Sequence, residues 1–315
     1  MEKGAAIALV TGGNRGLGLG VAELLCERLG QASLVYIAAR DVARGRTAAD
    51  KLTTAGHRAD FLELDLSSDA SVAAAAATIE DRHGGLDILI GNAAMMPDGD
   101  QRDQVDAFLN TNNFGTHRLI RSFGPLLRDG ARFLIVASRH GLLTAGLPAQ
   151  SKATLDTQVQ REQALREQTK MRLFGYTSDK MSEERKRIFH AETATLESIE
   201  AALGEFATSL KRGTALTDGW GDWINPPSKA GQIAATLVFA RDMEAEARRR
   251  DILINVCCPG FVDTDATRAV YGDTTSALSP REAAENLVWA VTRPSGSTEP
   301  YGEMLFGKHA VRVHE

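Results

Sequence analysis

Three glycines placed directly after the first apolar segment constrain the fold of this chain more than any other feature. Residues 5–10 read AAIALV, a run of strand length, and residues 11–18 read TGGNRGLG before a helical pattern begins. Gly12, Gly16 and Gly18 allow a tight turn and a close backbone approach, and a following helix offers free N–H groups to an anion. Between a strand and a helix, such a loop is typical of a pyrophosphate-binding turn in a doubly wound α/β sheet.

The rest of the chain repeats this alternation of a short apolar segment with a stretch of helical periodicity. The strand-like segments are uninterrupted apolar runs, which is what a parallel sheet covered on both faces requires. They occupy residues 5–10, 33–39, 58–64, 86–90, 132–137, 252–256 and 303–306, and the helical patterns include residues 18–29, 42–55, 69–83, 105–127 and 230–250. The sequence therefore predicts an α/β fold with a Rossmann-type doubly wound parallel sheet of about seven strands.

One region interrupts the alternation. Residues 142–223 carry no strand pattern, and helical patterns within them cover residues 158–172, 182–190 and 196–212. Because the region is short and rich in charge, we interpret it as a helical insertion that covers the active site rather than as a separate domain. We expect residues 1–315 to form a single domain, which is an acceptable size for an α/β fold.

The charge balance and the cysteines argue against several classes of protein. The 36 Lys and Arg against 41 Asp and Glu give a net charge of −5, which argues against a nucleic-acid or membrane surface. No apolar run approaches the roughly 18 residues that span a bilayer, and we expect no signal peptide, so the predicted location is the cytoplasm. Cys26, Cys257 and Cys258 show no disulfide or metal-binding spacing, and the last two are interpreted as buried small hydrophobic residues.

The end of the second predicted strand indicates which dinucleotide the loop suits. A site for NAD usually has a carboxylate there, which binds the ribose diol. Here the strand ends at Arg40, and Arg15 lies inside the glycine loop, so that two guanidinium groups suit a 2′-phosphate. NADPH is the predicted cofactor, with NAD as the alternative because Asp41 follows directly. Asp65, after the third strand, is predicted to hydrogen-bond an adenine amine or, alternatively, to cap the next helix.

The sequence resembles the short-chain dehydrogenases/reductases and, within that family, the carbonyl reductases. The resemblance rests on TGGNRGLG (11–18), AARD (38–41), LDL (64–66), NAA (92–94), NTNNFGT (110–116), VAS (136–138), AETAT (191–195) and NVCCPGFVDTD (255–265). It implies NADPH-dependent reduction of a ketone, aldehyde or quinone. The cofactor-binding residues that the loop and the resemblance predict are Gly12, Asn14, Arg15, Gly16, Leu17, Gly18, Arg40, Asp65, Leu66, Asn92, Ala93, Lys229, Pro259, Gly260, Val262 and Thr264.

The same resemblance predicts the catalytic residues and one departure from the family. In the family a serine polarises the carbonyl, a tyrosine protonates the alkoxide, a lysine assists the tyrosine and holds the ribose, and an asparagine orients a water. Ser138, Lys229 and Asn112 match three of these roles, but the position of the tyrosine holds Asn225. A carboxamide cannot deliver a proton near neutral pH, and losing such an acid usually costs ~10²–10⁴ in rate. We also expect the proline pair 226–227 to stiffen the segment before Lys229.

Three other side chains are candidates for the missing acid. Tyr176 precedes Lys180 with the family's spacing, but it lies in the insertion, and a coincidental pattern is the favoured interpretation. His140, two residues after Ser138, titrates near neutral pH, although a solvated loop histidine is the simpler interpretation. Tyr271 is interpreted as part of a lid over the substrate.

More than one kind of function is compatible with this site. Hydride transfer needs only a nicotinamide positioned against an electrophile, so we expect a divergent NADPH-dependent reductase of a small carbonyl, enone or iminium substrate. One alternative is a redox-neutral cyclase or isomerase in which Ser138, Asn225 and Lys229 polarise a carbonyl, and another is a non-catalytic NADPH-binding protein.

The insertion also bears on the substrate and the oligomeric state. Its aromatic residues favour an apolar or aromatic substrate, although ordinary core packing explains them almost as well; they are Phe174, Phe206, Trp220 and Trp223. In carbonyl reductases a similar insertion covers the surface through which other family members form tetramers. The resemblance therefore implies a monomer.

Overall fold

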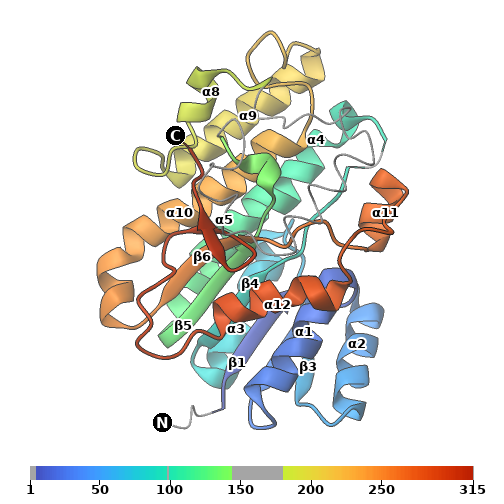
Figure 1. The fold of residues 1–315 in the computed structure, drawn as a ribbon, viewed down its shortest axis with the longest axis vertical. Helices are drawn as coiled ribbons and strands as arrows, with labels where there is room; N and C mark the ends of the chain where they lie inside the picture. The colour runs from blue at the N-terminus through green and yellow to red at the C-terminus, as the bar shows by residue number, and fades with distance from the viewer. Residues whose placement is uncertain (1–4, 98, 144–179, 315) are drawn as a thin grey trace.

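The computed structural model describes residues 5–97, 99–143 and 180–314, and its strands form one sheet (Figure 1). Among the described residues the sheet has eight strands in the order β3-β2-β1-β4-β5-β6-β7-β8. They are β1 (Ile7–Thr11), β2 (Leu34–Ala39), β3 (Ala59–Glu63), β4 (Leu86–Gly91), β5 (Leu127–Val136), β6 (Leu253–Cys258), β7 (Met304–Phe306) and β8 (His309–Val311). The first seven pair in parallel, and β8 pairs antiparallel with β7. The predicted doubly wound parallel sheet is confirmed, with β8 as an addition at its edge.

Helices cover both faces of the sheet, as the uninterrupted apolar strands require. One face packs against α1 (Gly16–Leu29), α2 (Val42–Thr54) and α12 (Pro280–Val291). The other packs against α3 (Asp69–His83), α4 (Gln101–Leu109), α5 (Gly115–Phe123) and α10 (Asn225–Arg249). The strand order runs in opposite directions from β1 and β4, so the carboxyl ends of these two strands leave a crevice in which such sheets bind ligands.

Two predicted helices begin or continue differently in the structure. The pattern over residues 105–127 is not one helix: α4 and α5 are joined by a π-helical turn at Asn110–Phe114, and β5 already begins at Leu127. The helix expected from residue 230 begins at Asn225. Pro226 and Pro227, which were expected to stiffen the segment before Lys229, therefore lie in its first turn, where a missing N–H costs nothing.

The described part of the insertion packs onto α4, α5 and α10. Here α9 (Leu196–Arg212) matches its predicted bounds, whereas the pattern over residues 182–190 forms only the short α8 (Glu183–Arg187). Residues 158–172 lie outside the described residues. Phe206 and Trp220 are fully buried, with ring centroids 5.8 Å apart, so core packing is the function of these two aromatic residues.

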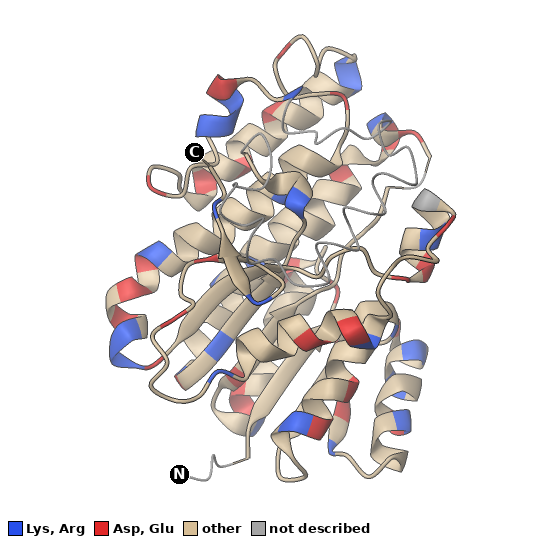
Figure 2. Ribbon diagram, in the orientation of Figure 1, with Lys and Arg blue, Asp and Glu red and all other residues tan. Residues whose placement is uncertain are grey.

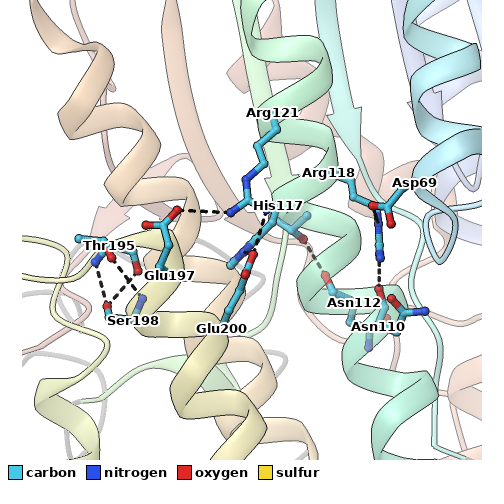
Figure 3. A network of polar contacts seen from close by, with 11 residues as sticks. Asp69, Asn110, Asn112, His117, Arg118, Arg121, Thr195, Glu197, Ser198 and Glu200 are labelled. Atoms are coloured by element: carbon cyan, nitrogen blue, oxygen red, sulfur yellow. Dashed lines mark hydrogen bonds and ion pairs between the residues drawn. The ribbon is translucent and has the colours of Figure 1, made fainter.

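Polar contacts hold α9 against α5 (Figure 3). The Nδ1 atom of buried His117 lies 2.7 Å from Glu200 Oε1, and Arg121 on the same helix pairs with Glu200 at 3.1 Å and with Glu197 at 3.5 Å. These contacts, together with the apolar face of α9, fix the insertion on the face of the sheet where α5 lies.

Charged residues occur mostly on the helices and in the connecting loops, with few on the strands (Figure 2). Arg132 on β5 is an exception, since it is only 1% exposed. Its guanidinium donates to the main-chain carbonyl of Asp251 and lies 3.3 Å from the carboxylate of the same residue. Among the described residues, no helix is long and apolar enough to cross a membrane.

Candidate active site

The glycine-rich loop joins β1 to α1 and forms one wall of a cavity at the carboxyl ends of the strands. Gly12 and Gly16 have φ angles of 65° and 52°, in the left-handed region that favours glycine. At Gly18 an added Cβ atom would lie 2.2 Å from the carbonyl oxygen of Gly12, which is a clash with backbone. The first turn of α1 lines the same cavity, so its free N–H groups and its positive dipole end are available to an anion.

The end of β4 is clamped onto this loop. Thr11 Oγ1 accepts hydrogen bonds from the backbone N–H groups of Asn92 and Ala93, both at 2.9 Å. The Asn92 side chain donates in turn to the carbonyl oxygen of Thr11 at 3.0 Å. These bonds fix the crevice between β1 and β4, because each of them joins the two strand ends directly.

Several segments distant in sequence meet at this cavity. Its walls include these predicted cofactor-binding residues: Gly12, Asn14, Arg15, Gly16, Leu17, Gly18, Arg40, Asp65, Asn92, Ala93 and Thr264. The walls do not include five others, namely Leu66, Lys229, Pro259, Gly260 and Val262. Leu66 and Val262 are buried in the apolar core, and Pro259 and Gly260 follow the end of β6. Sequence reasoning missed other residues that line the cavity, among them Arg44, Met95, Met96 and Thr111.

Three arginines stand at the mouth of the cavity. Arg15, Arg40 and Arg44 are exposed and line its wall. The carboxylate of Asp41 is engaged, since it caps α2 by accepting from the backbone N–H of Arg44 at 2.9 Å and pairs with the Arg44 side chain at 2.6 Å. These bonds lower the pKa of Asp41. A 2′-phosphate fits this cluster of guanidinium groups better than a ribose diol does.

Asp65 lies between the arginines and the strand ends. It accepts hydrogen bonds from the backbone N–H and the hydroxyl group of Ser67, at 2.9 and 2.7 Å, while Ser68 caps α3. Partial burial opposes ionisation of Asp65, but the bonds from Ser67 and the charge of Arg40 outweigh it and lower its pKa. An ionised Asp65 can accept a hydrogen bond from an amine such as that of adenine. The alternative that Asp65 caps the next helix is wrong, because Ser68 is the N-cap of α3.

Reversing one charge in this cluster is expected to change the cofactor preference. Arg40→Asp should weaken NADPH binding by about 10–150-fold, since a hydrogen bond to a charged group contributes about 1.5–3 kcal/mol, while NADH binding should improve or stay unchanged. Fluorescence titration of each reduced cofactor measures both dissociation constants. Arg46→Asp is the matched control, because Arg46 lies on α2 but not in the cavity wall. Equal loss of NADPH affinity in the two variants would contradict this role.

Ser138 follows β5 directly and caps the short helix η3 (Arg139–Gly141). Its Oγ atom lies 3.1 Å from Nδ1 of His140 and accepts the backbone N–H of His140 at 3.3 Å. The His140 ring meets Trp223 edge-on, with centroids 5.0 Å apart, and both residues are half-buried. The structure thus joins Ser138 to a histidine that sequence reasoning treated as a loop residue.

Lys229 lies one turn into α10 and is held by a side chain that the sequence did not single out. Its Nζ atom donates to Gln232 Oε1 at 2.6 Å, and Gln232 Nε2 donates to the carbonyl oxygen of Asn112 at 3.0 Å. All three residues are buried. Burial lowers the pKa of Lys229 to about 8. The Asn112 side chain is itself engaged, since it exchanges two hydrogen bonds with the backbone of Met95.

Asn225 occupies the first position of α10, one helical turn before Lys229. It is only 5% exposed, and its Oδ1 atom is buried without a hydrogen-bond partner among the described residues. A buried acceptor of this kind costs free energy unless a ligand donates to it. A carboxamide in this place can accept or donate a hydrogen bond but cannot act as an acid.

Comparison with known proteins agrees with this geometry. Residues 6–151 match the family model described as short chain dehydrogenase. Over 99% of its length the chain is 29% identical to the NADPH carbonyl reductase 1 of Sus scrofa, of which the match covers 95%. The same protein of Bos taurus is 28% identical, with 99% of this chain and 100% of that protein covered. The chain is thus similar to short chain dehydrogenases over its N-terminal part and to NADPH carbonyl reductases over nearly its whole length.

Several solved structures share the fold of this chain. Salutaridine reductase from Papaver somniferum superposes with a TM-score of 0.73 at 21% identity, covering 96% of this chain and 100% of that one. Menthone neomenthol reductase from Mentha piperita gives a TM-score of 0.67 at 22% identity, covering 96% and 98%. A short-chain dehydrogenase from Burkholderia cenocepacia, in complex with NADP, gives 0.57 at 21% identity, covering 96% of each chain.

The three candidate proton donors differ in where the structure places them. His140 lies beside Ser138, as described above. Tyr176 lies outside the described residues, and Tyr271 is the last residue of α11 (Asp265–Tyr271). The structure brings His140 into contact with a predicted catalytic residue, and it does not describe the side chains of Tyr176 and Tyr271.

The remaining cysteine and histidine clusters do not add to the site. Burial raises the pKa of the Cys257 thiol, and raises that of Cys26 to about 11, so both are inert at neutral pH. His190, Glu192 and His314 are close enough to share a metal ion. The two imidazole rings are stacked, however, with centroids 4.2 Å apart and planes 15° from parallel. Their in-plane lone pairs therefore do not converge on one point.

Proposed function

We propose that this protein is an NADPH-dependent reductase that transfers hydride to a small organic carbonyl, enone or iminium-type substrate. The observation that carries the proposal is the joint arrangement of a glycine-lined anion cradle, an arginine cluster suited to a 2′-phosphate, and Ser138 with Lys229 at the adjoining strand and helix. The curated relatives that match nearly the whole chain are named NADPH carbonyl reductases, which supports the same cofactor and reaction class.

The residues of the cradle fit NADPH. When bound, NADPH supplies a hydride from C4 of its nicotinamide ring. The N-terminus of α1 and the loop glycines bind the pyrophosphate, while Arg15, Arg40 and Arg44 bind the 2′-phosphate. Lys229 binds the ribose hydroxyls, and the chain from Lys229 through Gln232 to the Asn112 carbonyl fixes its ammonium group in place.

Ser138 polarises the substrate carbonyl. Its position at the end of a central strand fixes it on the rigid sheet, and its hydroxyl group donates to the oxygen on which negative charge develops. Asn225, at the place where the family has its acid, holds a neighbouring hydroxyl or amine through its unpartnered Oδ1 atom. An iminium substrate needs no proton at all, because hydride addition leaves a neutral amine. An aldehyde or ketone does need one.

The redox-neutral alternative lacks a specific observation in its favour. A cyclase or isomerase would need Ser138, Asn225 and Lys229 to polarise a carbonyl without using the cofactor's hydride. The names of the relatives favour redox chemistry instead. The same names favour redox chemistry over a non-catalytic NADPH-binding protein.

Two further features of the proposal concern substrate and assembly. An apolar or aromatic substrate suits Met95 and Met96 in the cavity wall and the half-buried ring of Trp223 beside His140. A monomer is supported by the position of α9. This helix packs on α4 and α10 and so covers part of the helical layer on that face of the sheet.

The experiment that tests the function is an assay of NADPH oxidation in the presence of an electrophilic carbonyl. Para-nitrobenzaldehyde and benzoquinone serve as probes, and N-methyl-dihydroisoquinolinium serves as an iminium ion that accepts hydride without a proton. We expect the wild-type protein to oxidise NADPH with at least one of them, and to prefer NADPH over NADH. Absence of oxidation with all three, in a protein that binds NADPH tightly, would contradict the proposal.

A further inference from the structure

We propose that His140 supplies the proton for carbonyl reduction through the hydroxyl group of Ser138. This inference rests on the proposed function and replaces the tyrosine that the resemblance places at position 225. In this arrangement Ser138 contacts the substrate oxygen, and His140 acts through Ser138 as the source of the proton.

The first observation is the contact between the two side chains. Ser138 Oγ and His140 Nδ1 lie 3.1 Å apart, and the backbone N–H of His140 also donates to Ser138 Oγ at 3.3 Å. The turn of η3 produces both contacts, because Ser138 is its N-cap and His140 is its second residue. The pairing is therefore built into the local backbone and does not depend on a distant segment.

The number of hydrogen bonds that a hydroxyl can make gives this contact its chemical meaning. A serine hydroxyl has one donor and two acceptor positions. When His140 is protonated, Ser138 Oγ accepts from Nδ1–H and from the backbone N–H, and its own O–H is free to donate to a substrate oxygen. When Nδ1 is unprotonated, the serine O–H instead turns toward it. Protonation of His140 thus prepares Ser138 to act as a donor.

The second observation is where η3 lies. An added Cβ atom at Gly141 would be 2.4 Å from the carbonyl carbon of Lys229, so η3 packs directly against the first turns of α10. The His140 ring also contacts Trp223, two residues before Asn225. His140 therefore lies between Ser138 and the segment that carries Asn225 and Lys229. Its ring is half-buried, which leaves a route for a proton from solvent.

The proposed step balances. Hydride from NADPH C4 forms the new C–H bond, and the carbonyl π electrons move to oxygen. The alkoxide takes the hydroxyl proton of Ser138, and Ser138 takes the Nδ1 proton of the His140 imidazolium. NADP⁺, the alcohol and a neutral imidazole protonated at Nε2 result, and solvent then restores the Nδ1 proton.

Arg139 and Lys229 are cations of these elements, whereas the acidic residues of α10, Asp242, Glu244 and Glu246, lie more than three turns beyond Lys229. Arg139, on η3 itself, lies over the Phe306 ring with its guanidinium carbon 4.7 Å from the ring centroid. Lys229, on α10, donates to Gln232. Lys229 is the rival proton source. A pH dependence near the Lys229 pKa of about 8 should survive the substitution His140→Gln, whereas one that belongs to His140 should not.

The test compares two substrates in His140→Gln and Ser138→Ala variants. Stopped-flow single turnovers are measured with para-nitrobenzaldehyde, which needs a proton, and with N-methyl-dihydroisoquinolinium, which does not. We expect each variant to reduce the aldehyde about 10²-fold more slowly or worse, and the iminium ion at a rate within about twofold of the wild type. The double variant should be no slower than the slower single variant, because the two residues act in sequence. His309→Gln, at an exposed position on β8, is the control.

Each outcome bears on a different claim. Wild-type aldehyde reduction should fall as the pH rises and the proton source is lost, and His140→Gln should abolish this dependence. Equal losses of rate for both substrates would indicate a structural role for the substituted residues. An unchanged aldehyde rate, or a break in the wild-type pH profile near pH 8 that persists in His140→Gln, would assign the proton to another group. Each of these results overturns the inference while the reductase function stands. Reduction of neither substrate by the wild type would overturn the proposed function, and this inference with it.

Discussion

Replacing Lys229 with methionine is expected to abolish most of the activity while making the free protein more stable. The reductase rate should fall by ~10²–10⁴, because the ammonium group that we propose to bind the ribose and so position the cofactor is lost. Lys229 is buried, and its pKa lies near 8 instead of the ordinary 10.5. Folding therefore pays for the desolvation of this charge at neutral pH.

The sign of the pH dependence follows from that shift. Between pH 8 and 10.5 the unfolded chain binds more protons at Lys229 than the folded chain does, so wild-type stability should rise through this range. At pH 7 the cost is at most about 3 kcal/mol, since each pKa unit corresponds to about 1.4 kcal/mol. Lys229→Met should recover part of this free energy.

Urea denaturation of the cofactor-free protein at pH 7 and at pH 10 measures both effects. Lys51→Met is the matched control, because Lys51 is exposed on α2 and pairs with Glu23 at the surface. The control should leave the stability almost unchanged at either pH. A Lys229→Met protein that is less stable than the wild type at pH 7 would contradict the placement of an unfavourable buried charge at this position.

Replacing Gly18 with alanine is expected to abolish NADPH binding. A Cβ atom there would lie 2.2 Å from the carbonyl oxygen of Gly12 and 2.6 Å from Asn92 Nδ2, so the loop and its clamp to β4 must both shift. Because the same backbone forms the anion cradle, we expect a loss of affinity of at least about 10²-fold, equivalent to about 2.7 kcal/mol. Isothermal titration with NADPH measures it.

Gly204→Ala is the control for this substitution. Gly204 lies inside α9, and an added Cβ atom there has no neighbour within 4 Å. Alanine should therefore leave NADPH binding unchanged and stabilise α9 slightly. Unchanged NADPH affinity in a folded Gly18→Ala protein would show that the glycine loop does not bind the cofactor. If circular dichroism shows that Gly18→Ala is unfolded, the same titration is made on Asn92→Ala.

The fold could be predicted from local patterns because each pattern was uninterrupted. The buried runs that became β1 and β6 carry five and six consecutive buried residues, and only a sheet covered on both faces tolerates that. The π-helical turn at Asn110–Phe114 has no such signature, since helical periodicity continues through it. The start of α10 was expected at residue 230 and not at Asn225, because the proline pair 226–227 was not interpreted as the first turn of a helix, a position that suits proline.

The candidate site was predictable only where a motif carries it. The spacing of Gly12, Gly16 and Gly18 predicts their role. Arg44 has no such motif, and it lines the cavity together with Arg40 because α2 begins at Val42. The one signal in the sequence for Arg44 was its position in the first helical turn after the second strand. Gln232 had no comparable signal. Its side chain contacts a residue 120 positions away in the sequence. A glutamine in a helix is ordinary until the packing of α10 on the π-helical turn Asn110–Phe114 is known.

The most direct test of the central claim is the fate of deuterium carried on C4 of NADPH. The protein is incubated with the labelled cofactor and the substrate that it turns over fastest, and the product is analysed by mass spectrometry and NMR. If the protein is a reductase, one deuterium appears on the carbon of the former carbonyl or iminium group, in proportion to the NADP⁺ formed. Product that forms without deuterium and without loss of NADPH would contradict the account and assign this site to a redox-neutral reaction.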